Sequence, residues 1–298
     1  MQPLRIALVG TGFTLHTQLP VFRLLPQAQV TDLIGRDADK TARLAQQHGI
    51  PGAGVSLPKL LQRGDIDLVC VTTPVDLHRQ MAEQCLQAGI AVLCEKPMAM
   101  DVTEAEAMQS TAAQSGQVAL IDHQLRYSPN LRKLRRLLHD GYLGKPLHVE
   151  LAMRVAGRLD PHRAHDWWSE KRRGGGALGA LGSHGIDQLR WLFGEVYSVN
   201  GVERTFIRER PQPGSLHMRP VDSDDFATFW LVLGEHRVHA SVVASVVAHA
   251  TDALRLEVFG EHGMLCLDES GHLYGSRREH AAAGSANAIA ASPAPATL

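Results

Sequence analysis

The sequence has little cysteine, few aromatic residues and almost no excess of either charge. Four cysteines stand among 298 residues with no Cys-x-x-Cys pair, which argues against a disulfide framework and for a reducing compartment. Aromatic residues make up only 5%, so the interior must be built mainly from aliphatic side chains. The 30 Lys and Arg residues against 31 Asp and Glu residues leave a formal charge of −1. This balance gives no electrostatic reason to bind nucleic acid or an anionic membrane.

Long apolar runs are absent as well. No stretch reaches the roughly 18 residues that a membrane-spanning helix needs, so no membrane segment is expected. The chain opens on an apolar, strand-like run and shows no basic segment followed by a cleavage site, so we expect a cytoplasmic protein.

The N-terminal part of the chain alternates short apolar runs with helical patterns. The runs lie at residues 4–9, 30–34, 66–72, 90–94 and 117–121. The helical patterns between them include residues 37–48, 79–88 and 101–115. Runs that are apolar throughout indicate strands buried on both faces, hence a parallel sheet. The repeated β-α units predict an α/β fold with a doubly wound parallel sheet.

The pattern changes near residue 122, where we place a domain boundary. Beyond it come helical patterns at 130–139 and 178–193, and several strand-like runs between 146 and 267. This part is expected to be an α+β domain with a large, open, mainly antiparallel sheet. The predicted division is therefore residues 1–122, 123–275, and an Ala/Ser/Pro-rich tail at 276–298 that we expect to be disordered. The polar stretch 208–218 is expected to be a surface loop.

A glycine-containing turn directly follows the first expected strand. Gly10 allows a tight turn, and Gly12 allows the backbone to approach a pyrophosphate at a helix N-terminus. Leu15 stands where the third glycine of the dinucleotide-binding fingerprint would be. The strand–turn–helix context favours a cofactor site that includes Phe13 and Thr14. The alternative is that the glycines only end the strand.

The end of the second expected strand is the position that distinguishes the two nicotinamide cofactors. NAD-specific sites usually carry an acidic residue there, whereas this chain reads Gly35-Arg36-Asp37. Arg36 is suited to a 2′-phosphate, which favours NADP(H) over NAD(H). The alternative is that Arg36 is a solvated loop residue and Asp37 caps the next helix.

Polar residues also stand at the ends of two later strands, where ligands of open α/β sheets bind. The first group holds Thr73, Pro74 and His78, and the second holds Glu95, Lys96 and Pro97. An adjacent acid and base are costly to bury without a purpose, and a lysine becomes a good proton donor when burial lowers its pKa. The alternative is a solvated strand exit.

A third candidate region begins with three consecutive glycines, residues 174–176. In the helix that follows, His184 and Asp187 are spaced i, i+3 and share one face. Trp167 and Trp168 precede the glycines, and either form an apolar wall for a ligand or anchor a buried loop. A lone helical histidine is usually structural, so spacing alone does not decide the role of His184.

Other kinds of site find little support. His162 and His165 lack partners at metal-ligand spacing, so no metal site is expected. The basic segment 132–136 is expected to be a solvated helix face. There is no nucleophile elbow and no P-loop.

Together these segments resemble the Gfo/Idh/MocA oxidoreductases, the group of glucose–fructose oxidoreductase and inositol dehydrogenase. The resemblance covers the chain to about residue 275, and it rests on the segments GTGF, TTPVDLH, AGIAVLCEKPMA, HQLRYSP and GGGALGALGSHGIDQLRWLFGE. It implies an N-terminal Rossmann domain followed by a domain whose sheet commonly forms oligomer contacts. A homo-oligomer is therefore expected.

The resemblance also implies roles for individual residues. Lys96 matches the family's catalytic lysine, and His184 matches the histidine that accepts or relays the proton during hydride transfer. The cofactor pocket would be shaped by Glu95 and Pro97 and lined by Thr73, Pro74 and His78. The substrate side would include Arg126, Tyr127, Trp167 and Asp187.

Two departures from the family's pattern leave the activity open. Ala180 stands where many family dehydrogenases have an aspartate four residues before the histidine, and the C-terminal part is short for the family. The main expectation is an NAD(P)-dependent dehydrogenase or reductase acting on a sugar, cyclic polyol or related carbonyl compound. One alternative is a dinucleotide-binding sensor with weak or no turnover, and another uses transient oxidation to drive elimination or glycoside cleavage.

Overall fold

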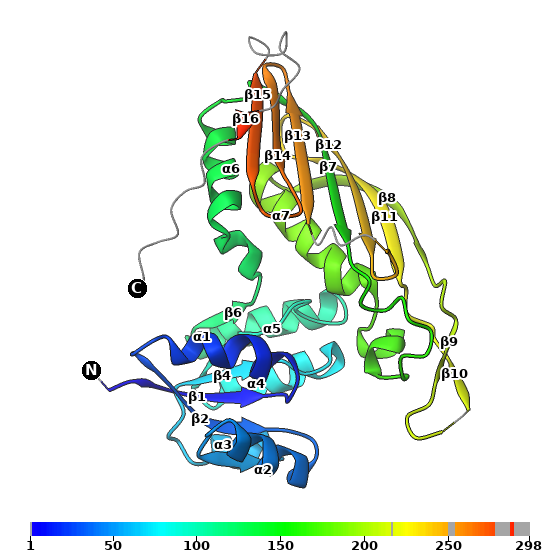
Figure 1. Cartoon of the computed structure of the whole chain (residues 1–298). Helices are drawn as coiled ribbons and strands as arrows, with labels where there is room; N and C mark the ends of the chain where they lie inside the picture. The colour runs from blue at the N-terminus through cyan, green and yellow to red at the C-terminus, as the bar shows by residue number, and fades with distance from the viewer. Residues whose placement is uncertain (1, 216, 250–253, 278–286, 289–298) are drawn as a thin grey trace. The chain divides into compact units, whose positions relative to one another are not determined.

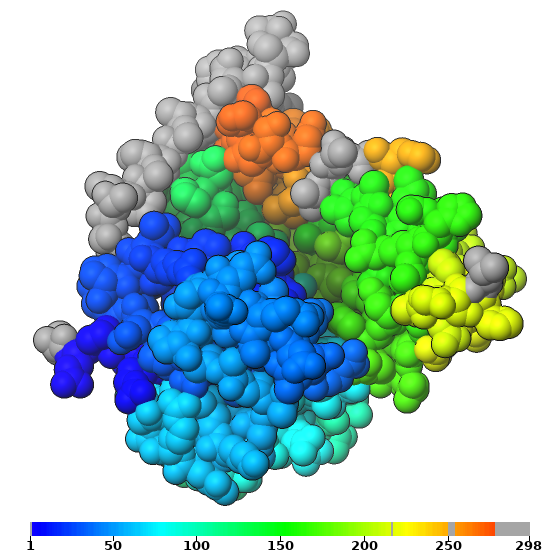
Figure 2. Space-filling view, turned by 60° about the horizontal axis from the view of Figure 1, so that its bottom comes forward, coloured from blue at the N-terminus to red at the C-terminus, as the bar shows by residue number. Residues whose placement is uncertain are grey.

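The computed structural model describes residues 2–215, 217–249, 254–277 and 287–288. The chain divides into two compact units, Met1–Asp122 and His123–Leu298. Figure 1 shows the elements of each unit, and Figure 2 shows the surface of the first unit in blue to cyan.

The first unit is built on a six-stranded parallel sheet with the order β3-β2-β1-β4-β5-β6. Its strands are β1 (Leu4–Val9), β2 (Ala28–Ile34), β3 (Gly52–Gly54), β4 (Leu68–Val71), β5 (Ala91–Cys94) and β6 (Ala119–Ile121). The side chains of β1 alternate between two separate hydrophobic cores, because Ile6 and Leu8 face one while Ala7 and Val9 face the other. The predicted doubly wound parallel sheet is thereby confirmed.

Helices cover both faces of this sheet. One core receives a π-helical turn at Thr14–Gln18, α1 (Leu19–Arg23) and α2 (Ala38–Gln47). The other receives α3 (Leu57–Leu61), α4 (His78–Gln87) and α5 (Val102–Ser115). The carboxylate of Asp37 accepts a hydrogen bond from the backbone N–H of Lys40 at 2.9 Å, so Asp37 caps α2.

The second unit is built on an eight-stranded mixed sheet with the order β16-β15-β14-β13-β7-β12-β11-β8. Only β7 and β12 run parallel, so the expectation of a large, mainly antiparallel sheet is confirmed. Its strands are β7 (Pro146–Arg154), β8 (Val196–Arg204), β11 (Phe226–Leu233), β12 (Val238–Ser245), β13 (Arg255–Gly260), β14 (Gly263–Leu267), β15 (Leu273–Arg277) and β16 (Asn287–Ala288).

Two helices, α6 (Pro129–His139) and α7 (Ser183–Phe193), pack on one face of this sheet (Figure 1). A Cβ atom on Gly185 would lie 2.9 Å from Leu151 and 3.5 Å from Val242, so this glycine lets α7 approach the sheet closely. Alternation places Phe229 and Leu231 toward the helices. Trp230, between them on β11, faces the other way and is 56% exposed.

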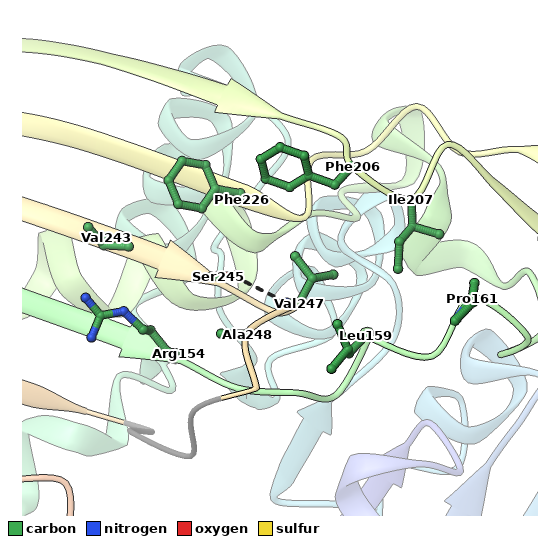
Figure 3. A pocket seen from close by; sticks show the side chains of 10 residues that line it. All are labelled: Arg154, Leu159, Pro161, Phe206, Ile207, Phe226, Val243, Ser245, Val247 and Ala248. Atoms are coloured by element: carbon green, nitrogen blue, oxygen red, sulfur yellow. Dashed lines mark hydrogen bonds between the residues drawn. The ribbon is translucent and has the colours of Figure 1, made fainter.

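The face without helices carries an apolar hollow of about 470 Å³ at one end. Phe226, Ser245 and Arg154 lie level with one another on three neighbouring strands and form its floor. Loop residues complete the wall, as Figure 3 shows for Leu159, Pro161, Phe206, Ile207, Val247 and Ala248.

Two segments of the second unit differ from the sequence-based expectation. The stretch expected to be a loop at 208–218 overlaps a hairpin of β9 (Glu209–Pro211) and β10 (Met218–Pro220). Arg210, on β9, is buried and donates to the backbone carbonyls of Asp160 and Arg158, which fixes this strand in place. The interval expected to be a disordered tail, 276–298, contains the end of β15 and all of β16, and its remaining residues lie outside the described part of the chain.

Candidate active site

The glycine turn after β1 fits closely against the neighbouring strand end. Gly10 has a φ of +119°, and a Cβ atom there would lie 2.3 Å from the Thr72 hydroxyl and 2.8 Å from the Thr72 carbonyl oxygen. Only glycine fits this position without movement of the backbone. A Cβ atom on Gly12 would meet no protein atom within 4 Å, so the turn has open space where a dinucleotide phosphate would approach.

The two residues after Gly12 point in different directions. Phe13 is 43% exposed, whereas Thr14 is buried and its hydroxyl donates to the Gln18 side chain at 3.1 Å. Thr14 therefore organises the helical turn that follows the glycines.

Arg36 is exposed at the end of β2, next to Asp37, which caps α2.

His78, at the start of α4, connects two strand-end segments. Its Nδ1 lies 2.9 Å from the Pro97 carbonyl oxygen, and its Nε2 lies 2.9 Å from the Thr73 carbonyl oxygen. Burial lowers the pKa of this imidazole, and a neutral ring donates to only one of the two carbonyls. His78 thus holds the segment of Thr73 beside the segment of Pro97.

Glu95 and Lys96 follow β5 and are both largely removed from solvent. Burial, followed by the charge of the neighbouring Asp122 carboxylate, raises the pKa of Glu95 to about 7. Burial lowers the pKa of Lys96, against the opposing attraction of Glu95 and Asp122. An acid with a raised pKa beside a lysine with a lowered pKa suits acid–base catalysis.

Asp122 is a component of this group that the sequence analysis did not single out. It follows β6 as Glu95 follows β5, and Cys94 pairs with Ile121 in the register of these strands. The Asp122 carboxylate accepts a hydrogen bond from the Gln18 amide at 3.3 Å. The rule that selected Glu95, a polar residue directly after a buried parallel strand, applies equally to Asp122.

In the second unit, His184 lies in the first turn of α7 and is 6% exposed. The ring of His123 meets the His184 ring edge-on, with the centroids 5.9 Å apart and the planes at 80°. His123 was quoted within the HQLRYSP segment but was not predicted to belong to a site.

Arg126 and Asp187 contact each other directly. The Arg126 guanidinium donates to both carboxylate oxygens of Asp187, at 2.8 and 2.5 Å, and this contact raises the pKa of Arg126. The Nδ1 atom of His123 lies 3.7 Å from the same carboxylate. The structure therefore brings Arg126, Asp187, His123 and His184 together, whereas Tyr127 is 77% exposed.

A carboxylate also lies at the start of the helical segment that carries His184. Asp224 accepts a hydrogen bond from the Leu178 backbone N–H at 2.7 Å, and burial raises its pKa. A Cβ atom on Gly176 would lie 2.0 Å from Asp224, so this glycine makes room for the carboxylate. Asp224 caps the segment that contains Ala180 and leads into α7.

The neighbouring residues Trp167 and Trp168 differ in their surroundings. Trp168 packs under the Arg158 guanidinium at 4.5 Å, and its carbonyl oxygen accepts a hydrogen bond from Ser223, so it anchors the loop. Trp167 begins a 3₁₀ turn and is partly buried. Across the described residues, no group of three His, Cys, Asp or Glu side chains has an arrangement suited to a metal ion.

Comparisons with known proteins agree with this architecture. A model described as an oxidoreductase family with an NAD-binding Rossmann fold matches residues 4–123. A second, described as the GFO/IDH/MocA C-terminal domain, matches residues 131–266. These matches define an oxidoreductase with an NAD-binding Rossmann fold in its N-terminal part. The chain belongs to the Gfo/Idh/MocA family.

Several relatives are similar over most of the chain. An uncharacterized oxidoreductase of Synechocystis is 33% identical, over 89% of this chain and 71% of that protein. Levoglucosan dehydrogenase of Pseudarthrobacter phenanthrenivorans is 27% identical, over 89% of this chain and 73% of that protein.

Solved structures extend the likeness. An oxidoreductase domain protein from Kribbella flavida has a TM-score of 0.86 at 31% identity, covering 97% of this chain and 80% of the other. A levoglucosan dehydrogenase complex with NADH and L-sorbose has a TM-score of 0.88 at 25% identity, covering 98% of this chain and 81% of the other.

Within the described residues, none of the helices has the length and apolar character needed to cross a bilayer.

Proposed function

We propose that this protein is an NAD(P)-dependent dehydrogenase or reductase that acts on a sugar, a cyclic polyol or a related carbonyl compound. The observation that carries the proposal is the buried Glu95–Lys96 pair at the carboxyl end of β5, where burial lowers the pKa of a lysine in a Rossmann domain. Relatives that are named as sugar dehydrogenases support the substrate class.

Residues 1–122 would bind the dinucleotide, and the described residues fit such a group. Gly10 and Gly12 would accommodate the pyrophosphate, since Gly12 leaves open space at the turn. The remaining contacts would come from Phe13, Thr14, Arg36, Thr73, Pro74, His78, Glu95, Lys96 and Pro97. When bound, the nicotinamide supplies or accepts the hydride.

Residues 123–275 would bind the substrate, with contacts from Arg126, Tyr127, Trp167 and Asp187. Lys96 and His184 would move the proton of the substrate hydroxyl, because burial lowers the pKa of Lys96 and an imidazole nitrogen can accept or donate a proton. The Arg126–Asp187 pair and the His123 ring would hold His184 in place.

The choice between NADP(H) and NAD(H) rests on Arg36. Its exposed guanidinium at the end of β2 favours a 2′-phosphate, although a similar solved structure contains NADH. A screen of sugars and polyols with each cofactor tests the function, read out as nicotinamide absorbance. An Arg36→Ala variant should lose affinity for NADP(H) about tenfold and keep its affinity for NAD(H). An absence of turnover with every substrate class would contradict the proposal.

The second unit would also mediate assembly into a homo-oligomer. The sheet face without helices exposes Trp230 and Val202 and has a second hollow of about 470 Å³ beside Trp230. Light scattering after gel filtration would show a mass above that of one chain.

The four cysteines are buried free thiols, which fits a cytoplasmic location.

A dinucleotide-binding sensor with weak turnover is the second candidate function, and Ala180 favours it. At this position a carboxylate would support the proton-accepting histidine in many family dehydrogenases, and its loss typically costs roughly 10²–10⁴-fold in acid–base catalysis. An Ala180→Asp variant separates the candidates. A large gain in turnover supports the enzyme, whereas unchanged, negligible turnover with intact cofactor binding supports the sensor.

A further inference from the structure

We propose that Glu95 and Asp122 share one proton next to Lys96, and that Glu95 is a positioning residue which sets the protonation state of the Lys96 ammonium. The proposal rests on the proposed function for its catalytic consequence. The shared proton itself is a property of the first unit and is testable without cofactor or substrate.

The backbone places the two carboxyl groups side by side. Cys94 on β5 pairs with Ile121 on β6, and Glu95 and Asp122 are the next residue of each parallel strand. The Asp122 backbone N–H donates to the Cys94 carbonyl at 2.8 Å, which continues the ladder past the last paired residues. The Asp122 carboxylate is close enough to raise the pKa of Glu95. Two carboxyl groups side by side can be joined by a hydrogen bond when one of them carries a proton.

The oxygen atoms of Glu95 indicate where a proton is needed. Oε2 accepts a hydrogen bond from the Lys96 backbone N–H at 3.2 Å, whereas the buried Oε1 has no protein donor. A buried carboxylate oxygen without a donor is costly, and a proton held between the two carboxyl groups removes that cost. The Asp122 carboxylate also disfavours the ionised form of Glu95, because like charges repel.

Among the described residues, Lys96 is the cation that acts on Glu95, and Asp122 is the anion. The imidazole of His78 lies near Lys96 and Asp76, and burial lowers its pKa. Both carboxyl groups act on the Cys70 thiol and Glu95 acts on the Cys94 thiol, but burial raises the pKa of both thiols and keeps them neutral. The Gln18 amide donates to Asp122 and is itself held by the Thr14 hydroxyl. Asp122 thus accepts a hydrogen bond from a protein side chain, whereas Glu95 Oε1 accepts none from the described residues, so Glu95 is the group that carries the proton.

The shared proton would control how strongly the pair attracts Lys96. With one proton the pair has a charge of −1, so burial dominates and the pKa of Lys96 stays low. When the proton leaves, the charge becomes −2 and the Lys96 ammonium is stabilised. Glu95 therefore acts through Lys96, and its ionisation would determine the pH range in which Lys96 exchanges a proton with a substrate hydroxyl.

The test is a pH titration of the full chain, without cofactor, labelled with ¹³C at the side-chain carboxyl carbons of Glu and Asp. The Glu95 signal, assigned by its absence in Glu95→Gln, should have a midpoint of about 7, and the Asp122 carbon should respond at the same pH. Two results in the protein without substitutions would overturn the proposal. One is a Glu95 midpoint in the ordinary range of a glutamate, and the other is no chemical-shift change of the Asp122 carboxyl carbon at the Glu95 midpoint.

Two variants sharpen the test. In Asp122→Asn the amide can donate to Oε1, so the Glu95 midpoint should fall by about one pH unit or more. The matched control Glu106→Gln removes an exposed carboxylate on α5 and should leave the midpoint unchanged. An unchanged midpoint in Asp122→Asn would show that burial alone protonates Glu95, and it would overturn the shared proton.

Kinetic measurements then separate this inference from the proposed function. Glu95→Gln mimics the protonated state, so kcat should lose its pH dependence near 7 while KM changes little. If the protein turns over a substrate but Glu95 titrates with an ordinary midpoint, the shared proton is refuted and the proposed function stands. A shared proton without any turnover would refute the proposed function and leave the pair standing.

Discussion

The rings of His123 and His184 meet edge-on, with 5.9 Å between their centroids. The Nδ1 atom of His123 in turn lies 3.7 Å from the Asp187 carboxylate, which Arg126 holds by two hydrogen bonds. We infer from these contacts that His123 orients the His184 ring.

The first prediction therefore concerns His123. A His123→Phe variant keeps an aromatic ring against His184 but loses the nitrogen that faces Asp187. We expect kcat to fall by about tenfold, less than the roughly 10²–10⁴-fold of a direct proton donor, with an unchanged free energy of unfolding. Steady-state kinetics and denaturant unfolding measure the two quantities. A wild-type kcat in His123→Phe would leave His123 with a packing role only.

The second prediction concerns the glycine turn. Gly12→Ala should fold with nearly wild-type stability, since its Cβ atom meets no protein atom, but should bind the dinucleotide at least about tenfold more weakly. Gly10→Ala should instead lower the free energy of unfolding by about 2 kcal/mol or more, because its Cβ atom would collide with the Thr72 backbone. Calorimetric binding and thermal unfolding distinguish the two. Equal effects of the two variants on both measurements would contradict the assignment of the turn.

The third prediction gives the pH dependence of stability. Because the pKa of Glu95 is raised from 4.5 to about 7 in the folded protein, the folded state holds an extra proton between these values. Its contribution to stability is present at low pH and is lost as the pH rises through 7. Glu95→Gln removes this dependence, so it should gain about 1–3 kcal/mol relative to the wild type between pH 5 and pH 8.

Urea unfolding at a series of pH values measures this difference. Glu106→Gln serves as the control, since its carboxylate is exposed and should give a difference that does not vary with pH. A constant difference between Glu95→Gln and the wild type would mean that Glu95 ionises normally in the folded state.

The fourth prediction concerns the packing of α7. Gly185→Ala would place a methyl group 2.9 Å from the Leu151 side chain and should cost about 1–3 kcal/mol of stability. A Cβ atom on Gly157, in the same unit, would meet no neighbouring atom within 4 Å, so Gly157→Ala is the matched control. A Gly185→Ala protein as stable as Gly157→Ala would show that α7 can shift away from the sheet at little cost.

Much of the fold follows from the pattern of apolar residues. The strands β1, β4 and β5 could be identified because their residues are apolar apart from Arg5, as expected where both faces of a parallel sheet are buried. β3 was missed, because Gly52–Gly54 has no apolar side chain beyond one alanine and is placed by its pairing with β2. β15 was missed as well, because Gly275, Ser276 and Arg277 follow its two apolar residues, and it gains its strand conformation from pairing with β14.

Candidate site residues could be identified in the sequence where one segment carries the signal. Glu95 and Lys96 stand out because they follow an apolar strand, and His184 stands out in its glycine-led helix. Asp122 and His123 contact partners that are remote in sequence, Gln18 and His184, and a single sequence does not display such contacts. The Arg126–Asp187 contact joins residues that were predicted separately and spans 61 positions.

The most direct test of the account is single-turnover hydride transfer in Lys96→Ala and His184→Ala, with Lys40→Ala and His139→Ala as exposed controls. A substrate from the sugar and polyol screen is mixed with enzyme saturated with NAD or NADP, and nicotinamide absorbance is followed in time. The account predicts losses of about 10²–10⁴-fold in the first two variants and wild-type rates in the controls. Wild-type rates in both Lys96→Ala and His184→Ala would contradict it.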